Sequence, residues 1–225
     1  FDDAQMQSLL QTPSLAHFAP WLRRVRAMAP YQLAPEIEQM IAERAPTGSA
    51  AWVRLFDETT TSMRFPFQGR EVTEAEILDA LSHQEADVRA AAGQSLSTTL
   101  KSHERLLSLT LNTIAKDKQI EDGWRGFNRP VASRNLANDV DDEVVDALVA
   151  AVNGRNADLT HRYYQLKAKW MGVKQLNWWD RNAPLPGDDD RQFSWDEARH
   201  IVLDAFAGFD PKMAEIAAPF FNNNW

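Results

Sequence analysis

The feature that most constrains the fold is a long stripe of mostly apolar residues in the middle of the chain. Its members recur at steps of four, four, four, three, four, four and three residues, the spacing of one helix face. They are Val88, Ala92, Leu96, Leu100, His103, Leu107, Leu111 and Ile114. Together with a capping-box pattern at Ser82 and Glu85, the stripe predicts a helix that ends near Lys118. Such a helix would span roughly 50 Å, and long helices of this kind build elongated helical walls.

Further helices are predicted on both sides of this one. Apolar residues at helical spacing, with prolines and glycines between the stretches, define most of their bounds. The predicted ranges are 14–29, 35–44, 49–64, 139–153, 158–171 and 194–208. Thr73 and Glu76 predict a capping box at the start of one more helix. Asp210 followed by Pro211 predicts the start of a last short helix.

Two segments are better suited to extended structure. Residues 65–72 combine aromatic alternation with a turn-forming glycine, which predicts a short hairpin. Residues 176–180 contain Trp178 and Trp179, whose side chains would point to opposite faces of a strand. An isolated strand there would be an incomplete edge, so we expect self-association or local disorder of that region in the chain alone. The predicted fold class is therefore all-α, with one or two short strands near residues 65–72 and 176–180.

The composition and net charge of the chain exclude several classes of protein. A chain of 225 residues, 44% hydrophobic and 25% charged, is typical of a soluble globular protein long enough to bury a core. The net charge of −8 argues against a nucleic-acid partner. No apolar run reaches the length needed to cross a bilayer, so no membrane partner is expected. The absence of cysteine excludes disulfides and thiolate zinc sites, and fits a cytoplasmic protein.

No catalytic motif is complete within the chain. A helical zinc-protease site needs two histidines four residues apart with a glutamate after the first. The nearest approach is His103-Glu104, where the fourth position is Leu107. The chain also lacks a Gly-x-Ser-x-Gly elbow and a glycine-rich phosphate loop. We therefore predict no catalytic residue and no metal ligand, and no zinc bound by this chain.

The candidate binding residues lie between residues 121 and 138, which lack periodicity and predict a long loop. Within it, residues 124–135 read WRGFNRPVASRN and contain Arg125, Arg129 and Arg134. In an acidic protein these arginines could form a rim that meets peptide carboxylates or carbonyls, because guanidinium offers a planar fork of donors. The alternative is an ordered loop that is held by its own hydrogen bonds.

Several segments, in order along the chain, resemble the oligoendopeptidase F family. They are residues 47–58 (TGSAAWVRLFDE), 63–67 (MRFPF), 111–118 (LNTIAKDK), 124–135, 161–169 (HRYYQLKAK), 178–186 (WWDRNAPLP), and 206–213 (FAGFDPKM) with the end of the chain at 220–225 (FFNNNW). The resemblance implies a mostly helical enzyme with a deep channel between an N-terminal lobe and a catalytic lobe. It also implies a zinc cofactor, held in the full-length enzyme by an H-E-x-x-H helix and a further glutamate, and oligopeptide substrates.

The zinc helix of that family should lie downstream of the tryptophan pair, and no match to it occurs before Trp225. The resemblance therefore implies a helical lobe at residues 1–175, and at residues 176–225 a strand and helices that lead into a missing C-terminal catalytic lobe. The start of the chain without methionine is consistent with a piece of a longer protein. The alternative is a complete, non-catalytic helical interaction module. Peptide preference and oligomeric state are not predicted.

Overall fold

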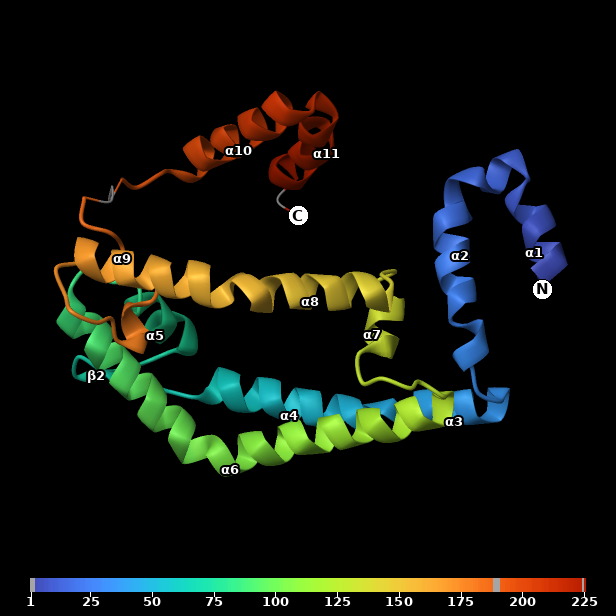
Figure 1. Cartoon of the computed structure of the whole chain (residues 1–225), viewed down its shortest axis with the longest axis horizontal. Helices are drawn as coiled ribbons and strands as arrows, with labels where there is room; N and C mark the ends of the chain where they lie inside the picture. Colours follow the sequence, from blue (N-terminus) through green and yellow to red (C-terminus); the bar gives the residue numbers. More distant parts are fainter. Residues whose placement is uncertain (1–2, 188–190, 224) are drawn as a thin grey trace. The chain divides into compact units, whose positions relative to one another are not determined.

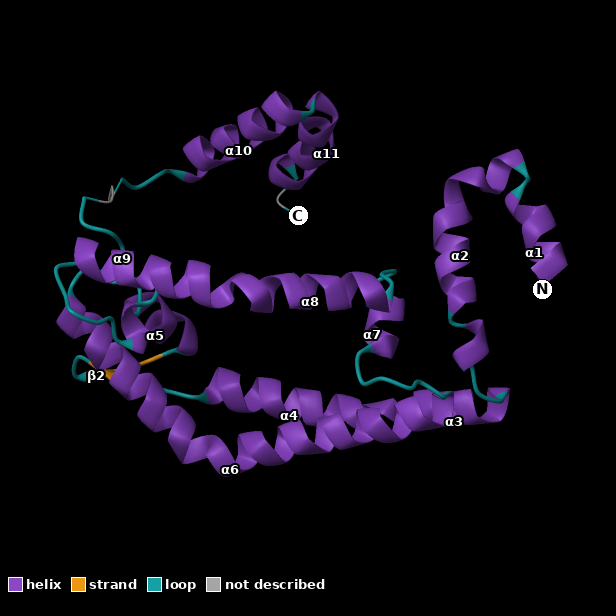
Figure 2. Cartoon of the chain, in the orientation of Figure 1, coloured by secondary structure: helices purple, strands orange, loops and turns teal. Residues whose placement is uncertain are grey.

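The computed structural model describes residues 3–187, 191–223 and 225, and it is mainly helical, as predicted (Figures 1 and 2). The chain divides into two compact units, Phe1–Pro184 and Leu185–Trp225. The predicted functional division after residue 175 stays a prediction. Among the described residues, no helix is both long and apolar enough to cross a membrane.

The long central helix is α6, Ala86–Arg125, whose 40 residues correspond to about 60 Å (Figure 1). It begins near the predicted position but extends seven residues beyond Lys118. Helix α4, Ser49–Ser62, lies alongside it. The capping box predicted from Ser82 and Glu85 at the start of α6 is wrong. The N-cap of α6 is Glu85, and no side chain caps the helix. The Glu85 N–H instead donates to His83 Nδ1 at 3.1 Å.

The predicted hairpin is confirmed and contributes Phe65 and Val72 to the core of the first unit. Strands β1, Phe65–Phe67, and β2, Arg70–Val72, pair antiparallel (Figure 2). The two residues between them, Gln68 and Gly69, both have positive φ, which suits a tight hairpin turn. Helix α5, Glu74–Ala80, follows with the predicted capping box. The buried core consists of Met63, Phe65, Val72, Ile77, Ala92 and Leu96.

Residues 3–47 form short helices that are separated by turns. The predicted helix over 14–29 is divided, because Pro20 occupies the first turn of α2 and has no N–H to continue the preceding turn. The elements are α1 (Asp3–Leu10), the 3₁₀ turn η1 (Pro13–Phe18), α2 (Ala19–Ala27), η2 (Ala29–Tyr31), α3 (Pro35–Arg44) and η3 (Ala45–Thr47). Helix α3 has the predicted bounds.

The predicted loop over residues 121–138 is largely helical. Helix α6 continues to Arg125 and ends where Gly126 takes a left-handed φ of 82°. A short helix α7, Ala132–Ala137, follows. Helix α8, Asp142–Asn156, then passes through a π-helical turn at Ala157–His161 (η4) into α9, Arg162–Trp170. The two helices predicted over 139–153 and 158–171 are therefore joined without a break (Figure 1).

The second unit is a helical pair. Helix α10, Trp195–Phe209, begins with the predicted capping box of Ser194 and Glu197. Helix α11, Pro211–Asn222, is capped by Asp210, whose Oδ1 accepts from Lys212 N at 2.8 Å. The two helices pack against each other.

Candidate functional site

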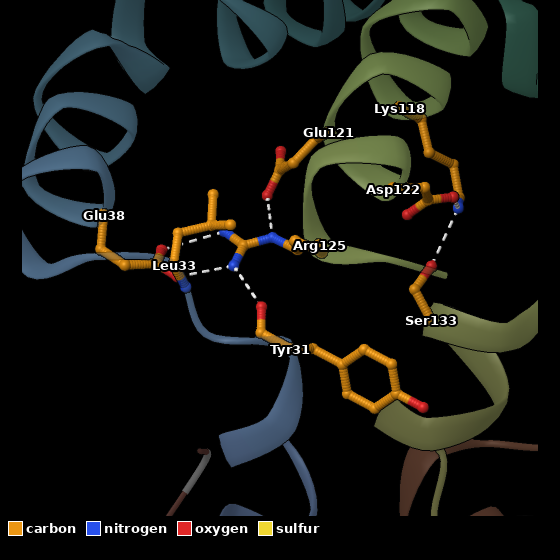
Figure 3. Close-up of polar contacts among 8 residues, drawn as sticks. All are labelled: Tyr31, Leu33, Glu38, Lys118, Glu121, Asp122, Arg125 and Ser133. Atoms are coloured by element: carbon orange, nitrogen blue, oxygen red, sulfur yellow. Dashed lines mark hydrogen bonds and ion pairs between the residues drawn. The ribbon is translucent and has the colours of Figure 1, made fainter. Parts of the chain in front are cut away.

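Arg125, the first predicted binding residue, lies at the centre of a polar network (Figure 3). Its Nη1 and Nη2 donate to the two carboxylate oxygens of Glu38 at 2.6 and 3.0 Å. Its Nε donates to Glu121 Oε1 at 2.7 Å, and Nη1 also donates to the Tyr31 carbonyl at 3.2 Å. With 13% of its side chain exposed, Arg125 has little donor capacity left for a ligand. It connects the end of α6 to η2 and α3.

The electrostatics of the network follow from this pairing. Hydrogen bonds from Arg125 and from the Leu33 N–H lower the pKa of Glu38 from 4.5 to about 2. The same bond to Glu38 raises the pKa of Arg125 above its usual range. Both side chains are therefore charged at neutral pH.

A second set of polar contacts, which joins α6 to α7, lies beside the Arg125 network (Figure 3). Lys118 forms an ion pair with Asp122 one turn along α6, and its Nζ donates to Ser133 Oγ of α7 at 2.9 Å. These side chains and Arg125 line an open cavity of about 610 Å³, together with Met28 and Phe127. Four of the charged side chains in its walls, Glu38, Lys118, Glu121 and Arg125, are already paired within the protein.

Arg129 joins the same segment to α8. Its Nη1 and Nη2 donate to the two oxygens of Asp146 at 3.0 and 2.7 Å, and Nη1 lies 3.2 Å from Asp142 Oδ2. The hydrogen bond from Arg129 lowers the pKa of Asp146. The Asn135 amide also donates to Asp142 at 2.7 Å. Arg129 thus fixes the turn before α7 against the first turns of α8.

Arg134 differs from the other two. It is exposed on α7, and its side chain has no hydrogen bond or ion pair with any residue that the structure describes. The structure therefore does not bring the three arginines together as one rim: Arg125 and Arg129 hold helices in place, while Arg134 is open to solvent. A substrate-binding role for the three stays a prediction, and the contacts favour the alternative of an ordered, internally bonded segment for the first two.

The strand predicted at residues 176–180 is wrong. Trp178–Asp180 form a 3₁₀ turn, η5, with Asn177 as N-cap. Asp180 Oδ2 accepts from Asn177 N at 3.0 Å and from Asn177 Nδ2 at 3.2 Å, which closes the turn. Its other oxygen, Oδ1, accepts from Arg89 Nε at 3.0 Å and forms an ion pair with Arg89 Nη2, also at 3.0 Å. The predicted incomplete edge does not exist, so the argument for self-association through an edge strand fails.

This turn is anchored to α6 by buried charge and by close packing. The side chains of Arg89 and Asp180 are 2% and 9% exposed, and Arg89 Nη1 also donates to the carbonyls of His83 and Gln84 at 2.7 Å. The Trp178 and Trp179 rings meet edge to face with centroids 5.7 Å apart. Both lie against Gly93, where a Cβ would come within 3.1 to 3.2 Å of ring and Cβ atoms. The tryptophan pair is thus a packing element.

The residues that the structure describes hold no donor set for a zinc ion. Among the described residues, no group of three or more histidine, aspartate or glutamate side chains converges as a metal site. His103, on the apolar stripe, is half-buried, and its Nδ1 lies 3.0 Å from the Thr99 carbonyl. The side chains in the described part of the chain therefore do not fit a zinc site.

Comparison with known proteins agrees with this architecture. The sequence profile described as Oligopeptidase F matches residues 1–65. Group B oligopeptidase PepB of Streptococcus agalactiae is 25% identical over 96% of this chain, and oligopeptidase PepF of Bacillus subtilis is 20% identical over 100% of it. The chain is thus similar to the N-terminal region of oligopeptidase F proteins. It spans about a third of these relatives, 37% and 34% of their lengths.

The fold of that family is also shared. The crystal structure of oligoendopeptidase-F from Enterococcus faecium superposes with a TM-score of 0.74 at 20% identity, covering 99% of this chain and 48% of that one. The profile match and these relatives, together with the shared fold, confirm the resemblance to oligopeptidase F that was stated from the sequence.

The sequence did not predict several of the residues that pair with the arginines described above. Glu38 and Asp146, the partners of Arg125 and Arg129, lie 87 and 17 residues away along the chain. The buried pair of Arg89 and Asp180 is separated by 91 residues. The only sequence signal for this pair was Asp180 following the tryptophans.

Proposed function

We propose that this chain is the N-terminal helical lobe of a zinc-dependent oligoendopeptidase that hydrolyses internal bonds of short peptides. The observation that carries the proposal is the end-to-end match of the chain to relatives named oligopeptidases, of which it covers about a third. In this proposal the zinc ligands and the catalytic glutamate belong to a C-terminal lobe, and the chain is inactive by itself. Its own residues bind and position substrate.

Exposed apolar side chains support a partner lobe. No residue of α8 is buried, and Val144, Leu148 and Val152 are each more than half exposed at helical spacing. Apolar surface of this kind is stabilised when another protein surface covers it. We assign that cover to the C-terminal catalytic lobe, with the oligopeptide as second partner.

Arg134 is the arginine available to meet the peptide. The absence of cysteine supports a cytoplasmic location.

The encoding reading frame tests the proposal against the alternative of a non-catalytic interaction module. The peptidase proposal expects an H-E-x-x-H pattern on a helix-compatible segment in the frame after Trp225, with a glutamate further on. A stop codon directly after Trp225 would support the interaction module instead.

A further inference from the structure

A groove lies between α9 and the segment that returns along it, and none of the functions above uses it. It has a volume of about 680 Å³, within the range of ligand pockets, which is roughly 300 to 1,000 Å³. Tyr164 and Ala168 line it from one face of α9, together with His161 at the π-helical turn. Lys174 and Arg181 line it from the returning segment.

The two walls of the groove are held in fixed positions. Gly172, with φ of 69°, ends α9 and reverses the chain, and Val173 N donates to the Ala168 carbonyl at 3.0 Å. At the other end, the buried Lys167 donates from Nζ to the Arg181 carbonyl at 2.8 Å. The neighbouring Asp180 is bonded to Arg89 in the protein interior. The backbone on both sides is therefore held by contacts within the protein.

The charge of the groove is unlike that of the protein. The chain carries a net charge of −8, yet none of the described residues that line this groove carries a carboxylate. The side chains of Lys174 and Arg181 are exposed, and neither forms a hydrogen bond or ion pair with a described residue. Trp178, 52% exposed, adds an aromatic surface to the same groove. Two cations beside aromatic walls, with no acid among these lining residues, are complementary to an anion that carries an apolar group.

We propose that this groove binds the C-terminal end of an oligopeptide. Arg181 and Lys174 would pair with the terminal carboxylate, Arg181 through its fork of donors. Tyr164 and Trp178 would contact the last side chain, which favours an aromatic or large aliphatic residue. The identity of the ligand as a peptide rests on the proposed function, whereas the preference for a carboxylate with an apolar neighbour rests on the groove itself.

Fluorescence anisotropy of the intact chain tests the proposal with two probes. One is fluorescein-labelled Gly-Gly-Ala-Leu-Phe with a free carboxylate, and the other is the same peptide ending in a carboxamide. The amide lacks the charge of the carboxylate and so loses the charged hydrogen bonds, and we expect it to bind at least about tenfold more weakly. Arg181→Gln and Lys174→Gln should each weaken the free acid by a similar factor and leave the weak amide binding nearly unchanged.

Lys116→Gln is the matched control, because Lys116 is exposed on α6 and donates to Gln119 outside the groove. It removes the same charge and should bind the free acid as the unmodified chain does. Equal affinity for acid and amide, unchanged affinity of both groove variants, or no saturable binding would each overturn the proposal. The assay has no catalytic readout, so its failure leaves the reading-frame test of the proposed function intact.

Discussion

Replacing Arg89 with methionine removes the positive half of the buried ion pair and keeps most of the side-chain volume. Asp180 would then be left buried without its cationic partner, and the carbonyls of His83 and Gln84 would each lose a donor. Breaking a buried pair in this way costs about 3 to 5 kcal/mol. Asp180 keeps two hydrogen bonds from Asn177, so we expect a value near the lower end, about 3 kcal/mol.

Urea unfolding followed by circular dichroism measures this loss. With a slope of about 2 to 3 kcal/mol per molar urea, the midpoint should fall by roughly 1 to 1.5 M. Arg70→Met is the matched control, because the Arg70–Glu76 pair is 63% and 44% exposed, and such exposed pairs contribute about 0 to 1 kcal/mol.

A double-mutant cycle with Asp180→Asn completes the experiment. Because the two residues share hydrogen bonds, the double variant should lose clearly less than the sum of the two single losses. A loss for Arg89→Met no larger than that for Arg70→Met, or additive losses in the cycle, would refute the anchoring role of this pair.

Three further predictions concern other parts of the chain. The pKa of Glu38 is lowered from 4.5 to about 2, so its pairing with Arg125 stabilises the fold above pH 4.5 and is lost as pH falls towards 2. The difference in melting temperature between the unmodified chain and Glu38→Gln should therefore shrink between about pH 5 and pH 2.5, and a constant difference would contradict the assignment. Thr73→Ala should lower the free energy of unfolding by about 1 kcal/mol in urea titrations, since the hydroxyl caps α5; an unchanged midpoint would show that the cap is redundant. Elemental analysis after dialysis against zinc should find well under one zinc per chain, because structural zinc needs about four converging ligands, and a stoichiometric tight site would contradict this.

The sequence predicted those elements whose signals are local. The stripe that begins at Val88 produces α6 because its period is that of a helix, and the capping boxes at Thr73 and Ser194 form because both partners lie within one turn. The box at Ser82 does not form, since His83 takes the Glu85 N–H. A local competitor two residues away was enough to replace the expected cap.

The segments predicted wrongly are those whose conformation depends on distant partners. Trp178 and Trp179 have side chains suited to strands, but Asp180 closes a turn and bonds Arg89, 91 residues away. Likewise, Arg125 lies in the last turn of α6 and forms hydrogen bonds with Glu38, which is 87 residues away along the chain. Pairings between distant residues leave no periodic pattern in a single sequence. The sequence therefore offered internal hydrogen bonding of the arginine segment only as an alternative, and it identified neither Arg89 as the partner of Asp180 nor Glu38 as the partner of Arg125.

The measurement that tests the central claim most directly is peptide hydrolysis by the isolated chain and by the product of the longer reading frame that contains it. Both are incubated with the same quenched fluorescent oligopeptide, with and without a zinc chelator. We predict that the longer product cleaves the peptide and loses this activity with chelator, while the isolated chain stays at the buffer rate. Chelator-sensitive cleavage by the isolated chain, or a longer product that has no peptidase activity, would contradict the assignment as the helical lobe of a zinc oligoendopeptidase.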